Sequence, residues 1–180
     1  MTGGGRMELR DTLYNKVRLR AMEPEDLDFL YELENDESLW NVGNTNVPYS
    51  RSLLLDYITS SRADIYADRQ VRMVMENDAA EPVGFVDLVD FDPRHSRAEL
   101  GIVVADRFRG QGYACAALGK ICDYARSVVG LHQIYAIVDK NNEICTGLLK
   151  TFGFQLDTEL KGWLRRGSVY EDAYLFQYFL

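Results

Sequence analysis

Two glycines flank a single polar residue in Arg109–Ala114 (RGQGYA), between an apolar run typical of a strand and a long amphipathic stretch typical of a helix. Because glycine has no Cβ, several backbone N–H groups can converge on one point there. The first N–H groups of a helix also lack internal partners and lie at the positive end of its dipole. The stretch therefore predicts an anion site, most naturally for a pyrophosphate.

Two common pyrophosphate motifs do not fit this stretch. A dinucleotide fingerprint needs a third glycine, but Gly110 and Gly112 are followed by Cys115 at that position. A nucleotide P-loop needs Ser or Thr after its Gly-Lys pair, and the pair at 119–120 is followed by Ile121 inside the amphipathic stretch. Residue identity thus excludes both motifs, although a plain strand-to-helix turn would also use glycines.

The pattern that remains, R-x-x-G-x-A after an apolar strand, resembles the pyrophosphate loop of the GNAT superfamily of N-acetyltransferases. Val138–Phe154 (VDKNNEICTGLLKTFGF) resembles that superfamily's next block, a strand followed by an Asn-initiated helix and Gly-Phe. Across about Val71–Leu180 the sequence is similar to bacterial polyamine (spermidine) and ribosomal-protein N-terminal acetyltransferases, and more so to the former. Asn142 matches the family's cofactor-contacting Asn, and it could equally serve as a helix cap.

The resemblance implies that acetyl-CoA is the cosubstrate and that its acetyl group passes directly to a bound amine in a ternary complex. It implies that the backbone of Ile102, Val103 and Val104 pairs with the pantetheine arm and supplies the oxyanion donor. The expected cofactor-binding residues are Ile102, Val103, Val104, Arg109, Gly110, Gln111, Gly112, Tyr113, Ala114 and Asn142.

The resemblance also suggests the groups that move protons. Glu99, in the strand before the glycine turn, is the expected general base, because an alkylammonium with a pKa of about 10 must lose a proton before it attacks. The alternative is an ion pair of Glu99 with Arg97 or Arg94. The family's usual acid, a tyrosine seven residues after Asn142, is replaced by Leu149, and Tyr170 is the candidate chosen in its place.

Carboxylates and aromatic rings gather in the first half of the chain. This combination suits an extended polycation, through ion pairs and cation–π contacts. A solvated acidic helix face is the plain alternative for the glutamates. The expected substrate-binding residues are Glu32, Glu37, Trp40, Tyr49 and Asp87.

These residues must be positioned by a layered domain. Apolar periodicity and turn residues predict an α/β (α+β) layered domain, a mixed sheet with helices packed on it. The resemblance implies that this sheet is GNAT-like, mixed and mostly antiparallel, with about seven strands flanked by about four helices. We expect a flexible N-terminal tail at 1–14 and a single acetyltransferase domain at 15–180. The expected strands are Val17–Arg20, Val71–Glu76, Val83–Phe91, Ala98–Val104, Gln133–Val138, Phe154–Leu160 and Val169–Leu180. The expected helices run from Pro24 to an end near Glu34–Glu37, from Ser52 to about Arg62, from Ala114 to Val128, and from about Glu143 to Thr151. In the third of these helices, Ala114 and Val128 are expected on the same apolar face.

Composition narrows the functional classes. Lys and Arg number 20 against 28 Asp and Glu, giving a net charge of −8, so we expect no nucleic-acid partner and a preference for a cationic small-molecule amine. The three cysteines and two histidines show no metal-ligand spacing, so no metal is expected. No signal peptide or membrane span is apparent, which predicts a cytoplasmic protein without a membrane partner. The apolar C-terminal strand is compatible with a homo-oligomer. The alternative functions are a protein N-terminal or aminoglycoside acetyltransferase, or a non-catalytic acyl-CoA-binding module.

Overall fold

The computed structural model describes residues 14–40 and 47–180. They form one seven-stranded sheet in the order β1-β2-β3-β4-β5-β7-β6. The strands are β1 (Arg18–Arg20), β2 (Val71–Glu76), β3 (Pro82–Asp92), β4 (Arg97–Val104), β5 (Gln133–Asp139), β6 (Gln155–Arg166) and β7 (Val169–Phe179). The helices are α2 (Leu27–Glu34), α3 (Glu37–Trp40), α4 (Arg51–Ser60), α5 (Ile65–Asp68), α6 (Tyr113–Tyr124) and α7 (Glu143–Phe152), together with short 3-10 turns at Pro24–Asp26 and Asp106–Phe108.

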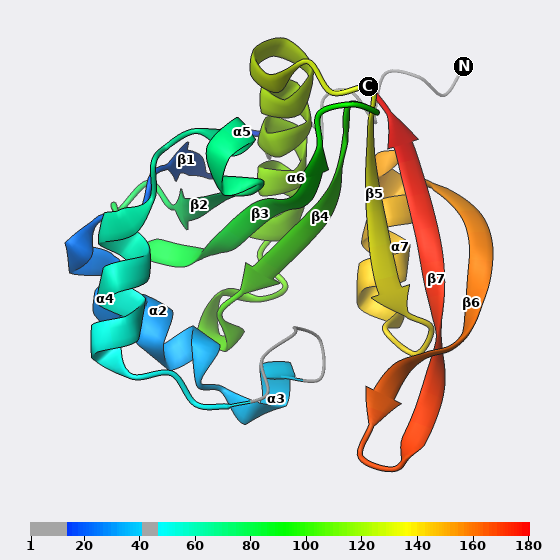
Figure 1. Ribbon diagram of the computed structural model, residues 1–180, viewed down its shortest axis with the longest axis horizontal. Coiled ribbons are helices and arrows are strands. Elements are labelled where there is room, and N and C mark those ends of the chain that lie inside the picture. The colour runs from blue at the N-terminus through cyan, green and yellow to red at the C-terminus, as the bar shows by residue number, and fades with distance from the viewer. Residues whose placement is uncertain (1–13, 41–46) are drawn as a thin grey trace.

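Two apolar layers cover the sheet (Figure 1), with α6 and α7 behind it and α2 and α4 toward the viewer. Side chains alternate across each strand, so neighbouring residues enter different layers. Val86 and Leu88 of β3 pack with α6 in the larger core, and Phe85 packs with α2 and α4 in the smaller one. The predicted mixed, mostly antiparallel sheet is confirmed, since among the strand pairs of the described residues only β4–β5 is parallel.

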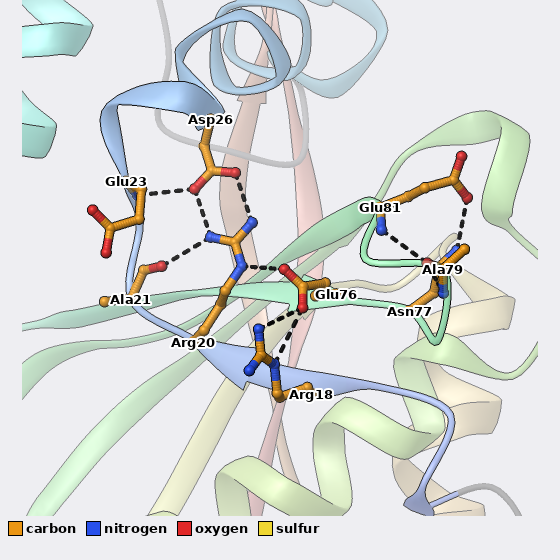
Figure 2. Close-up of polar contacts among 9 residues, drawn as sticks. All are labelled: Arg18, Arg20, Ala21, Glu23, Asp26, Glu76, Asn77, Ala79 and Glu81. Carbon is orange, nitrogen blue, oxygen red and sulfur yellow. Dashed lines mark hydrogen bonds and ion pairs between the residues drawn. The ribbon is translucent and has the colours of Figure 1, made fainter.

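The three-residue strand β1 is fixed to the sheet by charge. Glu76 of β2 accepts hydrogen bonds from both Arg18 and Arg20, as Figure 2 shows. Arg20 also binds both carboxylate oxygens of Asp26 at 2.7 and 2.8 Å, and Asp26 accepts the backbone N–H of Glu23 at 2.9 Å. This network orients the chain from the edge strand into α2, the first helix of the front layer.

The central strands part along their length. β4 pairs with β5 only from Arg97 to Glu99, opposite Gln133 to Tyr135. Beyond these pairs the two strands diverge, as Figure 1 shows below their upper ends. Both strands keep their other neighbours, because β4 pairs with β3 as far as Val104 and β5 pairs with β7 throughout. The sheet therefore has an internal opening, defined here as the length over which β4 and β5 are not paired with each other, on the side of Glu99 that leads to the start of α6.

At the other side of the sheet, β6 and β7 extend beyond β5 as a two-stranded arm. β7 pairs with β5 only from Ala173 onward, whereas its pairing with β6 begins at Val169. Arg166 in the arm forms ion pairs with Asp139 at the end of β5 and, at 2.7 Å, with Glu171. The arm is thus tied to the sheet by charge as well as by its strand pairing.

Two expectations about the elements were wrong in detail. Val128 was expected on the apolar face of the long helix, but its side chain is 69% exposed. The reason is a π-helical turn over Ala125–Val129, which changes the residue spacing after α6. Strand β6 continues to Arg166 instead of ending near Leu160, because a register shift between Leu160 and Leu164 lets it follow β7.

The expected domain limits remain predictions. Residues 1–13 of the expected tail lie outside the described residues, and so do residues 41–46. Tyr14, the last residue of that tail, donates a hydrogen bond from its hydroxyl to Asp123 of α6 at 2.8 Å. In the described part of the chain, no helix has the length and apolar character needed to cross a membrane.

Candidate active site

The glycine turn leads from β4 into α6 with two residues in the left-handed region. Gly110 has φ of 72° and Gly112, the N-cap of α6, has φ of 85°. Side chains rarely adopt this conformation, so glycine is required at both positions. A Cβ at Gly110 would meet nothing within 4 Å, which leaves the backbone there open to an approaching group.

Polar contacts hold this turn from both sides. Arg109 donates from Nε to the Val104 carbonyl at 3.0 Å, and Gln111 donates from Nε2 to the Arg107 carbonyl at 3.1 Å. Lys16 donates from Nζ to the Gln111 carbonyl at 2.9 Å. These three contacts fix the backbone of the turn between β4 and the first turn of α6.

This arrangement fits the diphosphate of coenzyme A. The amides of residues 110–114 and the positive end of the α6 dipole would hold the phosphates, with the Arg109 guanidinium nearby. The backbone of Ile102 to Val104 has no β5 partner on one side and can pair with an extended chain. Each cofactor-binding residue expected in β4 and in the glycine turn therefore lies along one continuous path.

Glu99 lies where that path ends, in the last pair of β4 and β5. Its neighbours Ala98 and Leu100 are buried in the larger core, so the Glu99 side chain is on the opposite face of the sheet, the face covered in part by α2 and α4. Burial raises the pKa of Glu99 above its usual range, and the negative charge of Asp90 adds to this effect. A carboxylate with a raised pKa is better suited to accept a proton near neutral pH.

Asp90 owes its position to a bulge in β3. The register with β4 shifts between Val89 and Asp92, and Asp90 has φ of 50°. Of the two alternative partners proposed for Glu99, Arg97 is engaged elsewhere, because it contacts Asp92 at 3.4 Å. Glu99 and Asp90 thus form an acidic pair at the closed end of the opening.

Asn142 is the N-cap of α7. Its side-chain oxygen accepts the backbone N–H of Cys145 at 3.0 Å, so the capping role is present, while its NH2 group makes no hydrogen bond to another described residue. Leu149, in the place of the family tyrosine, is 1% exposed and packs in the larger core. Burial raises the pKa of the Cys145 thiol, so this group remains protonated at neutral pH.

Tyr170, the expected acid, does not lie at this site. Tyr170 is 63% exposed at the tip of the β6–β7 arm. It lies seven residues along β7 from Gln177, the residue that pairs with Tyr135, which corresponds to about 23 Å at about 3.3 Å per residue. The Tyr170 hydroxyl therefore cannot reach the closed end of the opening within this chain.

Asp87 was expected to bind substrate, and the structure gives it an internal partner instead. Its carboxylate is bound by Arg72 through Nε at 2.9 Å and through Nη2 at 2.8 Å. Arg72 also contacts Glu34 of α2. Because Asp87 is only 8% exposed, its charge is used to hold β2, β3 and α2 together.

The other expected substrate residues lie around the end of α2. Glu32 and Glu37 are exposed, and Glu32 is 3.9 Å from Arg107. Trp40 donates from Nε1 to the Glu34 carbonyl at 2.9 Å, and Tyr49 packs against the smaller core. Their role in binding an amine stays a prediction.

Sequence reasoning missed Tyr135 and Arg72. Both are polar residues inside otherwise apolar strands, which was the available signal. Tyr135 is the β5 residue paired with Glu99, and Arg72 is the β2 residue paired with Asp87. In the described residues no group of three or more His, Cys, Asp or Glu could hold a metal ion, and none of the three cysteines is in a disulfide.

Comparison with known proteins agrees with this geometry. The family model "Acetyltransferase (GNAT) domain" matches residues 16–155. Spermidine N(1)-acetyltransferase of Escherichia coli K12 is 32% identical over 146 residues, covering 81% of this chain and 76% of that protein. Spermidine N-acetyltransferase from Vibrio cholerae, solved in complex with CoA and spermine, is 26% identical with a TM-score of 0.80, covering 91% of this chain and 95% of that chain. A dodecameric structure of the Vibrio cholerae enzyme, also 26% identical, has a TM-score of 0.76 and covers 91% and 94% of the two chains. The predicted resemblance is confirmed, and the chain belongs to the acetyltransferase (GNAT) domain family.

Proposed function

We propose that this chain transfers the acetyl group of acetyl-CoA to a primary amine of a polyamine such as spermidine. The observation that carries the proposal is the opening between β4 and β5, which runs from the glycine turn to Glu99. Acetyl-CoA supplies an activated acyl group at the closed end of that opening, next to the carboxylates of Glu99 and Asp90. The transfer is direct, in a ternary complex.

Glu99 acts as the general base. An alkylammonium has a pKa of about 10, so nearly every substrate molecule arrives protonated at neutral pH. The raised pKa of Glu99 narrows the gap between base and ammonium, which favours proton transfer. The negative charges of Glu99 and Asp90 also attract the ammonium group before it is deprotonated.

A polyamine is supported over other amines by the acidic character of the chain and by its relatives. The net charge is −8, and exposed Glu32 and Glu37 lie near the aromatic residues Trp40 and Tyr49. Such surroundings bind the distal ammonium groups of an extended polycation through ion pairs and cation–π contacts. The E. coli and V. cholerae relatives named above are spermidine acetyltransferases.

Thiol release from acetyl-CoA, measured with spermidine, spermine, putrescine, an aminoglycoside and a peptide panel, tests the proposal. We expect turnover with the polyamines. Glu99→Gln should lower kcat by about 10²–10⁴-fold while calorimetry shows unchanged CoA affinity. Glu81→Gln, in the exposed turn between β2 and β3, is the matched control and should behave as wild type.

Other outcomes would identify the alternatives. Turnover only with peptide N-termini or only with the aminoglycoside would replace the polyamine by that substrate class. Tight CoA binding without turnover on any amine would indicate a non-catalytic acyl-CoA-binding module.

Location and assembly belong to the same proposal. We place the protein in the cytoplasm, where thiols stay reduced, in line with three cysteines outside any disulfide. A homo-oligomer is supported by the dodecameric Vibrio cholerae enzyme. Light scattering on the purified chain would decide between an oligomer and a monomer.

A further inference from the structure

The position that carries the acid in the family lacks a proton donor here. Leu149 packs in the larger core at 1% exposure and has no hydrogen to donate. Tyr170 is at the far tip of the arm. A thiolate leaving group nevertheless gains from a donor as the C–S bond breaks, because a thiol has a pKa of about 8.5.

Tyr135 has the position that such a donor needs. It is the last β5 residue paired with β4, directly opposite Glu99. Ile134 and Ala136 on either side of it are buried in the larger core, so the Tyr135 side chain projects from the opposite face, the same face as Glu99. Its other neighbour is Gln177 of β7.

The surroundings of Tyr135 keep its hydroxyl protonated. Burial raises the pKa of Tyr135 first, and the carboxylates of Glu99, Asp90 and Asp92 raise it further against the opposing charge of Arg97. The neighbouring Gln177 side chain donates from Nε2 to Gln133 at 3.0 Å. Within the described part of the chain, neither the Tyr135 hydroxyl nor the Glu99 carboxylate makes a hydrogen bond with another residue.

We propose that Tyr135 is a catalytic residue that donates its phenolic proton to the departing sulfur of coenzyme A. This inference rests on the proposed function, because the thioester must lie at the closed end of the opening between β4 and β5. The backbone path along Ile102 to Val104 leads there, and Glu99 and Tyr135 border that end from the two strands.

The proton balance divides between the two side chains. Glu99 takes one proton from the ammonium, and the amine nitrogen then forms a bond to the thioester carbon. As the C–S bond breaks, its electron pair stays on sulfur and the phenolic proton moves to it, giving the free thiol. The second proton lost by the nitrogen returns through water to the Tyr135 phenolate, and the proton held by Glu99 passes to solvent.

Tyr135→Phe removes only the hydroxyl and is the direct test. Its matched control is Tyr124→Phe at the end of α6, a half-buried tyrosine that packs against the larger core and has no hydrogen bond to another described residue. We expect Tyr135→Phe to lower kcat by about 10²-fold with unchanged KM for the amine. The control should keep wild-type kcat. Wild-type kcat in Tyr135→Phe, or an equal loss in both variants, would overturn the assignment.

A binding measurement tests the same contact without turnover. Calorimetry compares coenzyme A with desulfo-coenzyme A, in which hydrogen replaces the thiol, at a pH where the bound sulfur is a thiolate. We expect wild type to prefer coenzyme A by about tenfold and Tyr135→Phe to lose this preference while it keeps its affinity for the desulfo form. An undiminished preference in the variant would refute the contact.

The two readouts separate this inference from the proposed function. If wild type acetylates no amine, the proposed function fails, and the comparison of the two cofactor forms still decides whether Tyr135 contacts the sulfur. If wild type acetylates polyamines while Tyr135→Phe does so equally well, only the role of Tyr135 fails.

Discussion

Replacing Arg72 by methionine should destabilise the fold strongly, because it removes the cation from a buried cluster of charges. Arg72 binds Asp87 through two hydrogen bonds of 2.9 and 2.8 Å and also contacts Glu34. Methionine has a similar length and leaves the Asp87 carboxylate buried without its guanidinium. Breaking a buried pair by removing one partner costs about 3–5 kcal/mol. We expect a loss of that size in the free energy of unfolding at about pH 7, measured by urea denaturation.

The stability loss caused by Arg72→Met should depend on pH, and the direction follows from the pKa of Asp87. Burial raises the pKa of Asp87 above its ordinary value, and Arg72 opposes that rise. Without Arg72 the folded-state pKa moves higher still, so the folded variant takes up protons that the unfolded chain does not bind. Its stability then increases as the pH falls through the folded-state pKa. The difference from wild type should therefore narrow as the pH falls below about 7 through the folded-state pKa of Asp87 in the variant, by at most about 1.4 kcal/mol per pH unit.

Arg51→Met is the matched control. Arg51 forms an ion pair with Asp28 of α2, but both side chains are largely exposed. Exposed pairs contribute about 0–1 kcal/mol, so this variant should lose little unfolding free energy at about pH 7 or at lower pH. A loss below about 1 kcal/mol in Arg72→Met, or a difference that stays constant with pH, would refute the reasoning about the buried cluster.

Three further predictions concern the stability of variants at two glycines and at the cap of α7. Gly147→Ala in the middle of α7, where an added Cβ meets nothing within 4 Å, should raise the unfolding free energy by about 0.5–1 kcal/mol. Gly84→Ala should lower the unfolding free energy by several times that amount, because the added Cβ would overlap the Val103 carbonyl oxygen. Thermal melts of the two glycine variants test both predictions. Equal melting temperatures for Gly147→Ala and Gly84→Ala would contradict this packing. Asn142→Ala should cost about 1 kcal/mol through the lost cap of α7, and should weaken CoA binding only if its NH2 group also meets the cofactor.

Much of the fold could be predicted because the elements that local sequence patterns favour are the ones that the sheet uses. The strand at Val71–Glu76 was placed at its observed limits, since a run of apolar residues bounded by turns leaves few alternatives. The helix beginning after Gly112 could also be predicted, because its glycine turn is a local signal. The face assignment failed at Val128, where a π-helical turn changes the spacing and no residue type announces it.

The site was harder to predict than the fold because it depends on pairing between distant segments. Glu99 could be located by resemblance, but its neighbour Tyr135 is set by a parallel register that the sequence alone does not specify. Asp87 was expected to bind substrate, because the sequence does not show that β2 pairs with β3 in a register that places Arg72 opposite it. Tyr170 was chosen for its chemistry alone, and only the length of β7 places it out of reach.

Several ion pairs contribute to the β6–β7 arm. Two-stranded ribbons are marginally stable in water by themselves. Besides the Arg166 contacts, Lys161 bridges Glu159 and Asp172 across the arm at 2.8 and 3.1 Å. Salt screens such exposed ion pairs far more than it weakens buried apolar contacts. Concentrated salt would therefore loosen the β6–β7 arm while the sheet and the helices packed on it stayed intact. The order of the β6–β7 arm thus responds to the ionic strength of its surroundings.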